Sequence, residues 1–147
     1  MPARQITPRS YVEKSLAEAI ERRVRKIVTT LSYVGEQCLS EARDNHGYID
    51  RTGNLTSSIG YVVLRDGVRV SGSDFRQISS GGEGSESGKK FLDSLVSQSG
   101  GGITLIMVAG MNYASYVETN YNVLISSELL MERLVPELMR KLGFEKV

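Results

Sequence analysis

The 147-residue chain has few of the residues from which enzymes build reactive sites. It contains one cysteine, one histidine and no tryptophan. A single cysteine, Cys38, excludes an internal disulfide, and a single histidine, His46, leaves few ways to build a metal site. Basic and acidic side chains nearly cancel, 18 against 17, which argues against a dedicated nucleic-acid binder because such proteins carry a clear basic surplus. We therefore expect no catalytic residue, no cofactor and no metal ion.

Long hydrophobic runs are also missing. No run approaches 18 apolar residues and the first thirty residues are polar, so we expect neither a membrane span nor a signal peptide. What the chain does have is 40% hydrophobic and 24% charged residues, the composition of a chain with a packed core. Its length corresponds to a single domain, residues 1–147.

A long helix is predicted from about Ser10 to Asn45. Apolar residues recur there every three or four positions, which is the stripe of an amphipathic helix: Leu16, Ile20, Val24, Ile27, Leu31, Val34 and Cys38. Ser10 with Glu13 fits a capping box at the start. Such a helix is about 50 Å long, more than a domain of this size needs. We expect either a kink near Gly35 or one end that projects to meet another subunit.

Three strands are expected after this helix. Leu55, Ile59, Tyr61 and Val63 alternate on one face of the first, and Asp66-Gly67 is typical of a two-residue hairpin turn. The third, Ile103–Ala109, is apolar on both faces, which favours a central position. Helical spacing returns over 126–142, where Pro136 predicts a kink or a separate last helix. The fold class is therefore α+β: a long N-terminal helix and a C-terminal helical segment packed on a small antiparallel sheet of three or four strands.

Glycine and serine dominate the segment before the third strand. From Ser79 to Gly102 they account for 14 of 24 residues. Such stretches behave as flexible linkers, so we predict a flexible arm at about 76–102. Within it, a short amphipathic helix would present four apolar residues to a partner: Phe91, Leu92, Leu95 and Val96.

Two other patterns suggest chemistry only weakly. Residues 81–90, GGEGSESGKK, lack the first glycine and the Ser/Thr of a phosphate-binding loop. A small hydrolase around His46 and Asp50 has no motif to support it.

The basic cluster at Arg22, Arg23, Arg25 and Lys26 supports an alternative function, a small nucleic-acid-binding module that uses the N-terminal helix. Glu18 and Glu21 stand four residues before Arg22 and Arg25, so we expect these charges to pair along the helix instead.

Two blocks in the sequence resemble a known family. Residues 52–59, TGNLTSSI, are similar to the TG-x-L-x-x-S-I block of the tail-completion, or head–tail joining, proteins of long-tailed bacteriophages. Residues 113–118, YASYVE, resemble the Y-A-x-Y-V-E block of the same family. Residues 134–138 are faintly similar to a third block, F-L-x-P-A-L, without its aromatic residue, and Asn120 stands where the family usually has glycine. The order of blocks and expected elements is the same.

The resemblance implies a virion structural protein of a phage or prophage, made in the bacterial host cytoplasm and assembled as a homo-oligomeric ring at the head–tail junction. It implies contacts with neck, connector and tail-tube proteins, proximity to phage DNA, no membrane and no catalysis. The residues that match the two blocks are expected to serve structure and contact: Thr52, Gly53, Leu55, Ser58, Ile59, Tyr113, Tyr116 and Glu118. The tyrosines would supply broad, stiff contact area.

Overall fold

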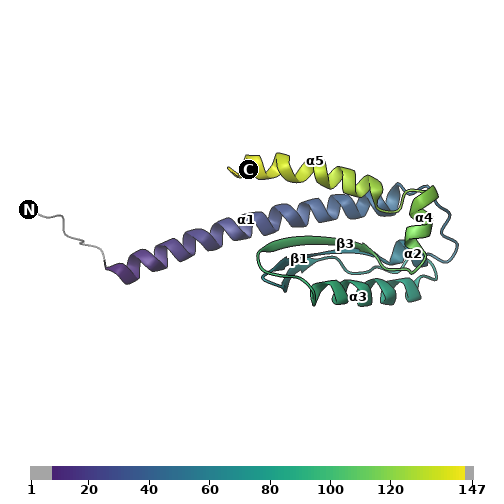
Figure 1. Ribbon diagram of the computed structural model, residues 1–147, viewed down its shortest axis with the longest axis horizontal. Coiled ribbons are helices and arrows are strands. Elements are labelled where there is room, and N and C mark those ends of the chain that lie inside the picture. The colour runs from purple at the N-terminus through teal and green to yellow at the C-terminus, as the bar shows by residue number, and fades with distance from the viewer. Residues whose placement is uncertain (1–7, 145–147) are drawn as a thin grey trace, which may run out of the picture.

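The computed structural model describes residues 8–144 of the chain. The first element in this range is one long helix, α1 (Arg9–Asp44). It runs unbroken through Gly35, where a side chain would overlap the ring of Tyr61, so this glycine permits close packing and marks no kink. The N-terminal part of α1 extends well beyond the rest of the domain (Figure 1). Of the two expectations for this helix, the projecting end is the one observed.

The predicted cap at Ser10 is wrong. Pro8 is the N-cap residue, and its carbonyl accepts the first helical bonds, from the amides of Tyr11 and Val12. Glu13 pairs instead with Arg9, at 3.0 Å. The chain therefore enters the helix directly from a proline, which has no amide hydrogen to leave unsatisfied.

The TG block forms a one-turn helix, α2 (Asn54–Ser57), which corrects the prediction that Leu55 begins a strand. Gly53 precedes it in the left-handed conformation, with φ of 79°, and the amide of Ser57 donates to the Gly53 carbonyl at 2.9 Å. Strand β1 (Ile59–Arg65) starts two residues later. The predicted hairpin is confirmed, because Asp66 and Gly67 both have positive φ and lead into β2 (Val68–Gly72).

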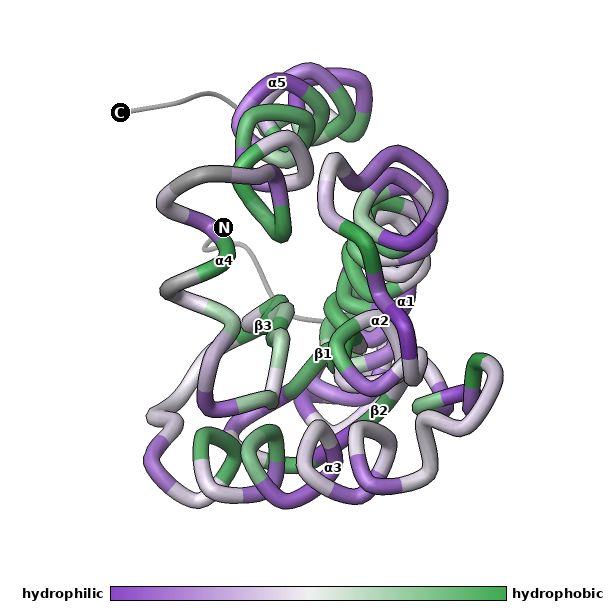
Figure 2. Tube along the Cα trace, turned by 90° about the vertical axis from the view of Figure 1, so that its right-hand side faces the viewer, coloured by the Kyte–Doolittle hydropathy of each residue, from purple (hydrophilic) through white to green (hydrophobic). Residues whose placement is uncertain are grey.

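The sheet is antiparallel with strand order β2-β1-β3, where β3 is Ile103–Ala109. The prediction that the third strand is central is wrong: β1 is the central strand and is buried from Ile59 to Leu64. Helices cover both faces of the sheet, and this explains why β3 is apolar on both sides although it lies at an edge (Figure 2).

The expected flexible arm is largely a helix, α3 (Gly82–Val96), packed on the sheet face opposite α1 (Figure 1). One side of it consists of small residues at helical spacing, Gly81, Gly84, Ser85 and Gly88, all buried. A side chain at Gly84 would overlap the Asn54 carbonyl, and one at Gly88 would lie 2.6 Å from the Ser58 carbonyl oxygen. The glycines therefore let two backbones approach closely and do not act as hinges.

Two helices complete the fold. The first, α4 (Ala114–Asn120), follows β3 after a short turn. Helix α5 (Ile125–Lys141) lies beside α1 and continues through Pro136. Of the two alternatives predicted at this proline, a kink or a separate last helix, the separate helix does not form. With α1 and α5 on one face and α3 on the other, the chain has the predicted α+β class.

Candidate interaction surface

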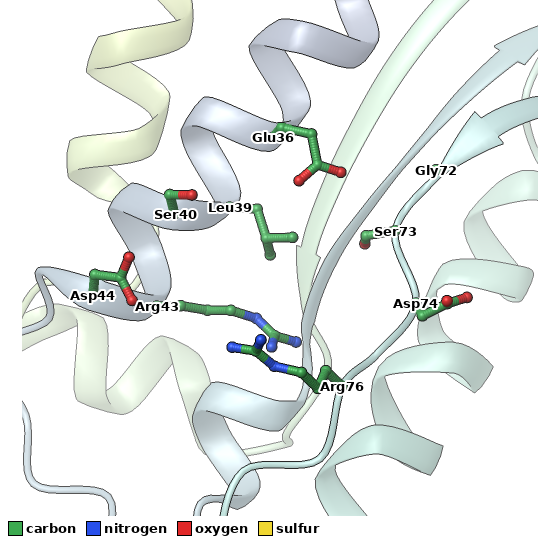
Figure 3. A pocket seen from close by; sticks show the side chains of 9 residues that line it. All are labelled: Glu36, Leu39, Ser40, Arg43, Asp44, Gly72, Ser73, Asp74 and Arg76. Atoms are coloured by element: carbon green, nitrogen blue, oxygen red, sulfur yellow. The ribbon is translucent and has the colours of Figure 1, made fainter.

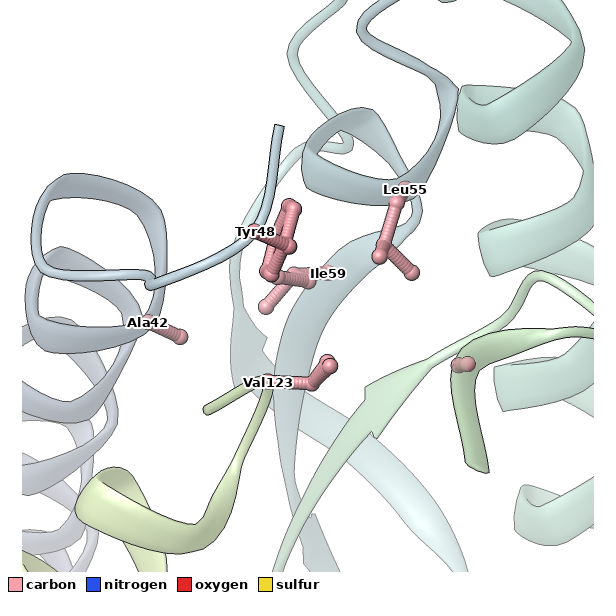
Figure 4. Close-up of a cluster of buried hydrophobic side chains, with 6 residues drawn as sticks. Ala42, Tyr48, Leu55, Ile59 and Val123 are labelled. Carbon is pink, nitrogen blue, oxygen red and sulfur yellow. The ribbon is translucent and has the colours of Figure 1, made fainter. Parts of the chain in front are cut away.

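The two motif blocks meet at one end of the molecule. Leu55 and Ile59 of the TG block and Ala114 of the YA block are buried in the same hydrophobic cluster, shown in Figure 4. Three residues from other parts of the chain complete this cluster: Ala42, Tyr48 and Val123. Segments about sixty residues apart thus share one core, so the apolar positions of the motifs are structural.

The polar residues of the TG block hold the chain around α2. Ser58 is buried, and its hydroxyl donates to the Leu55 carbonyl at 2.6 Å. The Ser58 carbonyl accepts the Gly110 amide at 3.1 Å, which continues the β1–β3 ladder. Thr52 is exposed and its hydroxyl accepts the Asn54 amide at 3.3 Å. Ser57, which sequence reasoning passed over, is fully buried, and its hydroxyl accepts the Ile78 amide at 2.7 Å.

Glu118 of the YA block is an intramolecular anchor. Its carboxylate accepts the amides of Val123 and Leu124, the latter at 2.8 Å, immediately before α5 begins. Tyr113 is 39% exposed, and burial, followed by the nearby carboxylates Asp50 and Glu83, raises its pKa. The side chain of Tyr116 lies outside the described residues. Glu118 therefore fixes the loop between α4 and α5, a role that becomes visible only with its partners in place.

The four residues predicted to contact a partner differ in their surroundings. Leu92 is buried against Val62, Leu64, Phe75 and Val108, so its predicted availability to a partner is wrong. Leu95 and Val96 pack at the margin of the same cluster. Phe91 is 44% exposed.

The other residues considered for chemistry serve the fold. The His46 ring stacks on Tyr48 at 4.0 Å between centroids, and its Nδ1 lies 2.9 Å from the Tyr48 carbonyl oxygen. Asp50 accepts the Thr56 amide at 2.8 Å. Cys38 is fully buried, and burial raises its pKa, which disfavours the reactive thiolate.

A polar cavity of about 360 Å³ separates α1 from the segment after β2 (Figure 3). The guanidinium groups of Arg43 and Arg76 face one another in it, and burial, followed by the charge of Arg76, lowers the pKa of Arg43. Arg43 donates to the Ile59 carbonyl at 3.1 Å. Three carboxylates also line this cavity, from Glu36, Asp44 and Asp74. They outnumber the two guanidinium groups, so the cavity has no excess of positive charge with which to hold an anion.

The outer edge of β3 is the most distinctive surface of the molecule. Within residues 8–144 no strand pairs with it. The Ser58–Gly110 and Asp66–Gly102 hydrogen bonds show that even-numbered residues of β3 bond to β1. The amides and carbonyls of the odd-numbered residues, Leu105 among them, therefore point outward.

Two apolar grooves follow this edge. The β3–α5 groove, of about 880 Å³, is lined at the start of β3 by apolar residues of α1, β3 and α5: Ile27, Leu31, Ile103, Leu105, Met131, Val135, Pro136 and Met139. The β3–α4 groove, of about 750 Å³, lies at the other end and includes Phe91, Leu95, Met107 and Met111. The apolar character of β3 is visible in its sequence, but its position at the edge is not, because that position depends on how many strands the rest of the chain adds to the sheet.

Some classes of site are missing from this part of the chain. Across residues 8–144 no three His, Cys, Asp or Glu side chains group as a metal site would need. None of the described helices has both the length and the hydrophobicity to cross a membrane. Comparisons of the chain with protein-family models, with curated proteins and with solved structures found no match.

Proposed function

We propose that this chain is a structural protein of a phage or prophage virion that acts in head–tail joining or tail completion and assembles with copies of itself into a ring. The observation that carries the proposal is the outer edge of β3, a seven-residue apolar strand with outward-pointing backbone groups and an apolar groove at each end. A long apolar edge of this kind invites pairing with another chain, and stable monomers normally shield it with charge, proline or a bulge.

The motif blocks support the head–tail assignment. They stand in the order of the tail-completion family, and their apolar residues form one cluster. Glu118, at the end of the second block, holds the loop that leads into α5. These residues are needed for the fold of this domain, so proteins with the same fold would share them for that reason.

The test is the assembly state of the purified chain. Sedimentation velocity over a range of concentrations, together with electron microscopy, should show a closed oligomer of defined size. Leu105→Pro removes an outward amide that bonds to nothing within the described sheet, and Thr104→Lys places a charged side chain on the edge strand itself. Both variants should fold, as shown by circular dichroism, and should fail to form the oligomer.

The control is Ile49→Lys, because Ile49 is 89% exposed and lies outside both grooves. It should assemble as the parent chain does. A parent chain that stays monomeric at the highest concentration reached would overturn the proposal, and so would edge variants that assemble normally.

One observation supports the alternative, a nucleic-acid-binding module. Glu21 pairs with Arg65 and not with Arg25 as expected, and no ion pair joins Glu18 to Arg22 within the described residues. The basic cluster is thus less neutralised than its sequence spacing suggests. Binding to double-stranded DNA that falls steeply with salt would support this function. Absence of binding at low salt would exclude it.

A further inference from the structure

The projecting part of α1 carries an apolar stripe that nothing covers within the described residues. Val12, Leu16 and Ile20 recur every four positions and are 46%, 60% and 51% exposed. The same stripe is half-buried at Ile27 and buried at Leu31. An amphipathic pattern that continues past the end of its own core indicates a second surface on which it packs.

The stripe cannot reach another surface of the described part of its own chain. Helix α1 is continuous over 36 residues, so its N-terminal part cannot fold back on the domain. Helix α5 ends at Lys141, near Arg23, whose guanidinium carbon lies 4.8 Å from the Phe144 ring centre. Beyond that point Figure 1 shows α1 extending alone, so no described residue of the same chain covers the stripe.

The β3–α5 groove has the chemistry to receive such a helix. Its floor is aliphatic, from Ile103, Leu105 and Val135, with Met139 as an adaptable side chain. Its volume, about 880 Å³, is the largest among the described cavities named above. In a helix-in-groove contact, a row of aliphatic side chains on one helix packs between the elements of another domain.

Charge favours the same match. Residues 9–26 contain six basic and three acidic side chains. The groove is bordered by Glu128 and Glu132, and neither forms an ion pair with another described residue. Opposite charges around an apolar contact select the partner and its orientation.

We propose that the Val12–Leu16–Ile20 stripe of one copy docks in the β3–α5 groove of a second copy. The inference rests on the proposed self-assembly and names the surfaces that meet. Stripe and groove are different surfaces of one chain, so the contact is head-to-tail, which is the kind that closes into a ring when the rotation between copies is right.

Cross-linking between two tagged copies tests the contact directly. One copy carries Leu16→Cys and the other Val135→Cys, while Cys38 stays in place because it is fully buried. Mild oxidation of the mixed oligomer should give a disulfide-linked pair that holds both tags. The matched control replaces Val135→Cys by Ile49→Cys, at a site outside the groove, and should give no such pair.

A second measurement does not depend on the cysteines. Leu16→Ala should weaken assembly roughly tenfold or more without changing the melting temperature of the dissociated chain, because it removes aliphatic area only from the contact. Glu132→Lys should also weaken assembly, by reversing the charge at the rim. Rings that form with no cross-link above the control, and with normal assembly of Leu16→Ala, would overturn this inference and leave the proposed function intact. A parent chain that never assembles would overturn both.

Discussion

Helices α1 and α3 pack on opposite faces of the same sheet by different means. Helix α1 brings large aliphatic side chains to the contact and buries Leu31, Val34 and Cys38, while the same stripe farther toward its N-terminus is exposed. Helix α3 brings glycine and serine, so its backbone lies against α2 and β1, and its single large buried side chain is Leu92.

The difference shows that the number of large apolar side chains on a helix does not indicate how closely the helix packs against its own chain. Helix α1 has more apolar surface than the described part of the chain buries, and we propose that the surplus packs on another copy. Helix α3 has little apolar surface, yet close approach makes most of its inner side inaccessible. Substitutions in the buried half of α1 and on the inner side of α3 should therefore weaken folding. Substitutions in the exposed half of α1 should weaken assembly and leave folding unchanged.

The largest effect is expected in the buried half of α1. Val34 is 0% exposed, so Val34→Asp places a charge without a partner in the core and should lower the free energy of unfolding by about 4 kcal/mol or more. Ile20→Asp, in the exposed half, should leave the unfolding of the dissociated chain unchanged and weaken assembly. Urea denaturation and sedimentation of both variants provide the comparison. Equal destabilisation by the two substitutions would show that the stripe is covered within one chain.

A smaller effect is expected from the glycine side of α3. Gly84→Ala would overlap the Asn54 carbonyl, which is backbone and cannot move aside easily. We expect a loss of about 1–3 kcal/mol of stability, the usual range for overpacking. Gly82→Ala is the matched control in the same helix, because its methyl group would meet only the flexible Gln77 side chain, 3.3 Å away.

Gly82 is the first residue of α3, where the preference of alanine over glycine is smaller than in a helix interior, so Gly82→Ala should be close to neutral. Thermal melts of the two variants distinguish the mechanisms. If α3 behaved as the flexible arm suggested by its composition, the two substitutions would have the same effect.

The same contrast, between contacts made by large side chains and contacts made by glycine, explains which parts of the fold could be predicted from the sequence. The long helix, the Asp66-Gly67 turn and the limits of β3 depend on local patterns, and these predictions are confirmed. The short amphipathic helix predicted around Phe91–Val96 is the C-terminal half of α3. The N-terminal half was missed because hydrophobic periodicity does not register a contact made by glycine. The regular spacing of Gly81, Gly84 and Gly88 was the available sign.

The candidate surface depends on longer-range facts. That β3 lies at an edge depends on the absence of a fourth strand in the described sheet. That Glu118 binds the amides before α5 depends on a turn of the chain after α4. The sequence alone showed which residues were apolar or acidic, whereas their partners followed from packing between distant segments.

The smallest effect is expected where α1 leaves the sheet. Arg65, at the end of β1, donates two hydrogen bonds to the Glu21 carboxylate, at 2.6 and 2.8 Å. The hydrogen bond from Arg65 lowers the pKa of Glu21 below its ordinary value of 4.5, so the folded state favours the charged form. The stability that this ion pair contributes should be fully present above pH 4.5, the ordinary pKa of the carboxyl, and should be lost as the pH falls through the lower pKa that Glu21 has in the folded state.

Arg65→Gln should therefore lower the midpoint of urea denaturation slightly at neutral pH and low salt, and the difference from the parent chain should vanish in acid or at high salt. Glu13→Gln, which removes the exposed Arg9–Glu13 pair from the projecting half, should change nothing. If neither substitution changed the denaturation midpoint, the boundary between the packed and the projecting parts of α1 would depend on apolar packing near Ile27 alone.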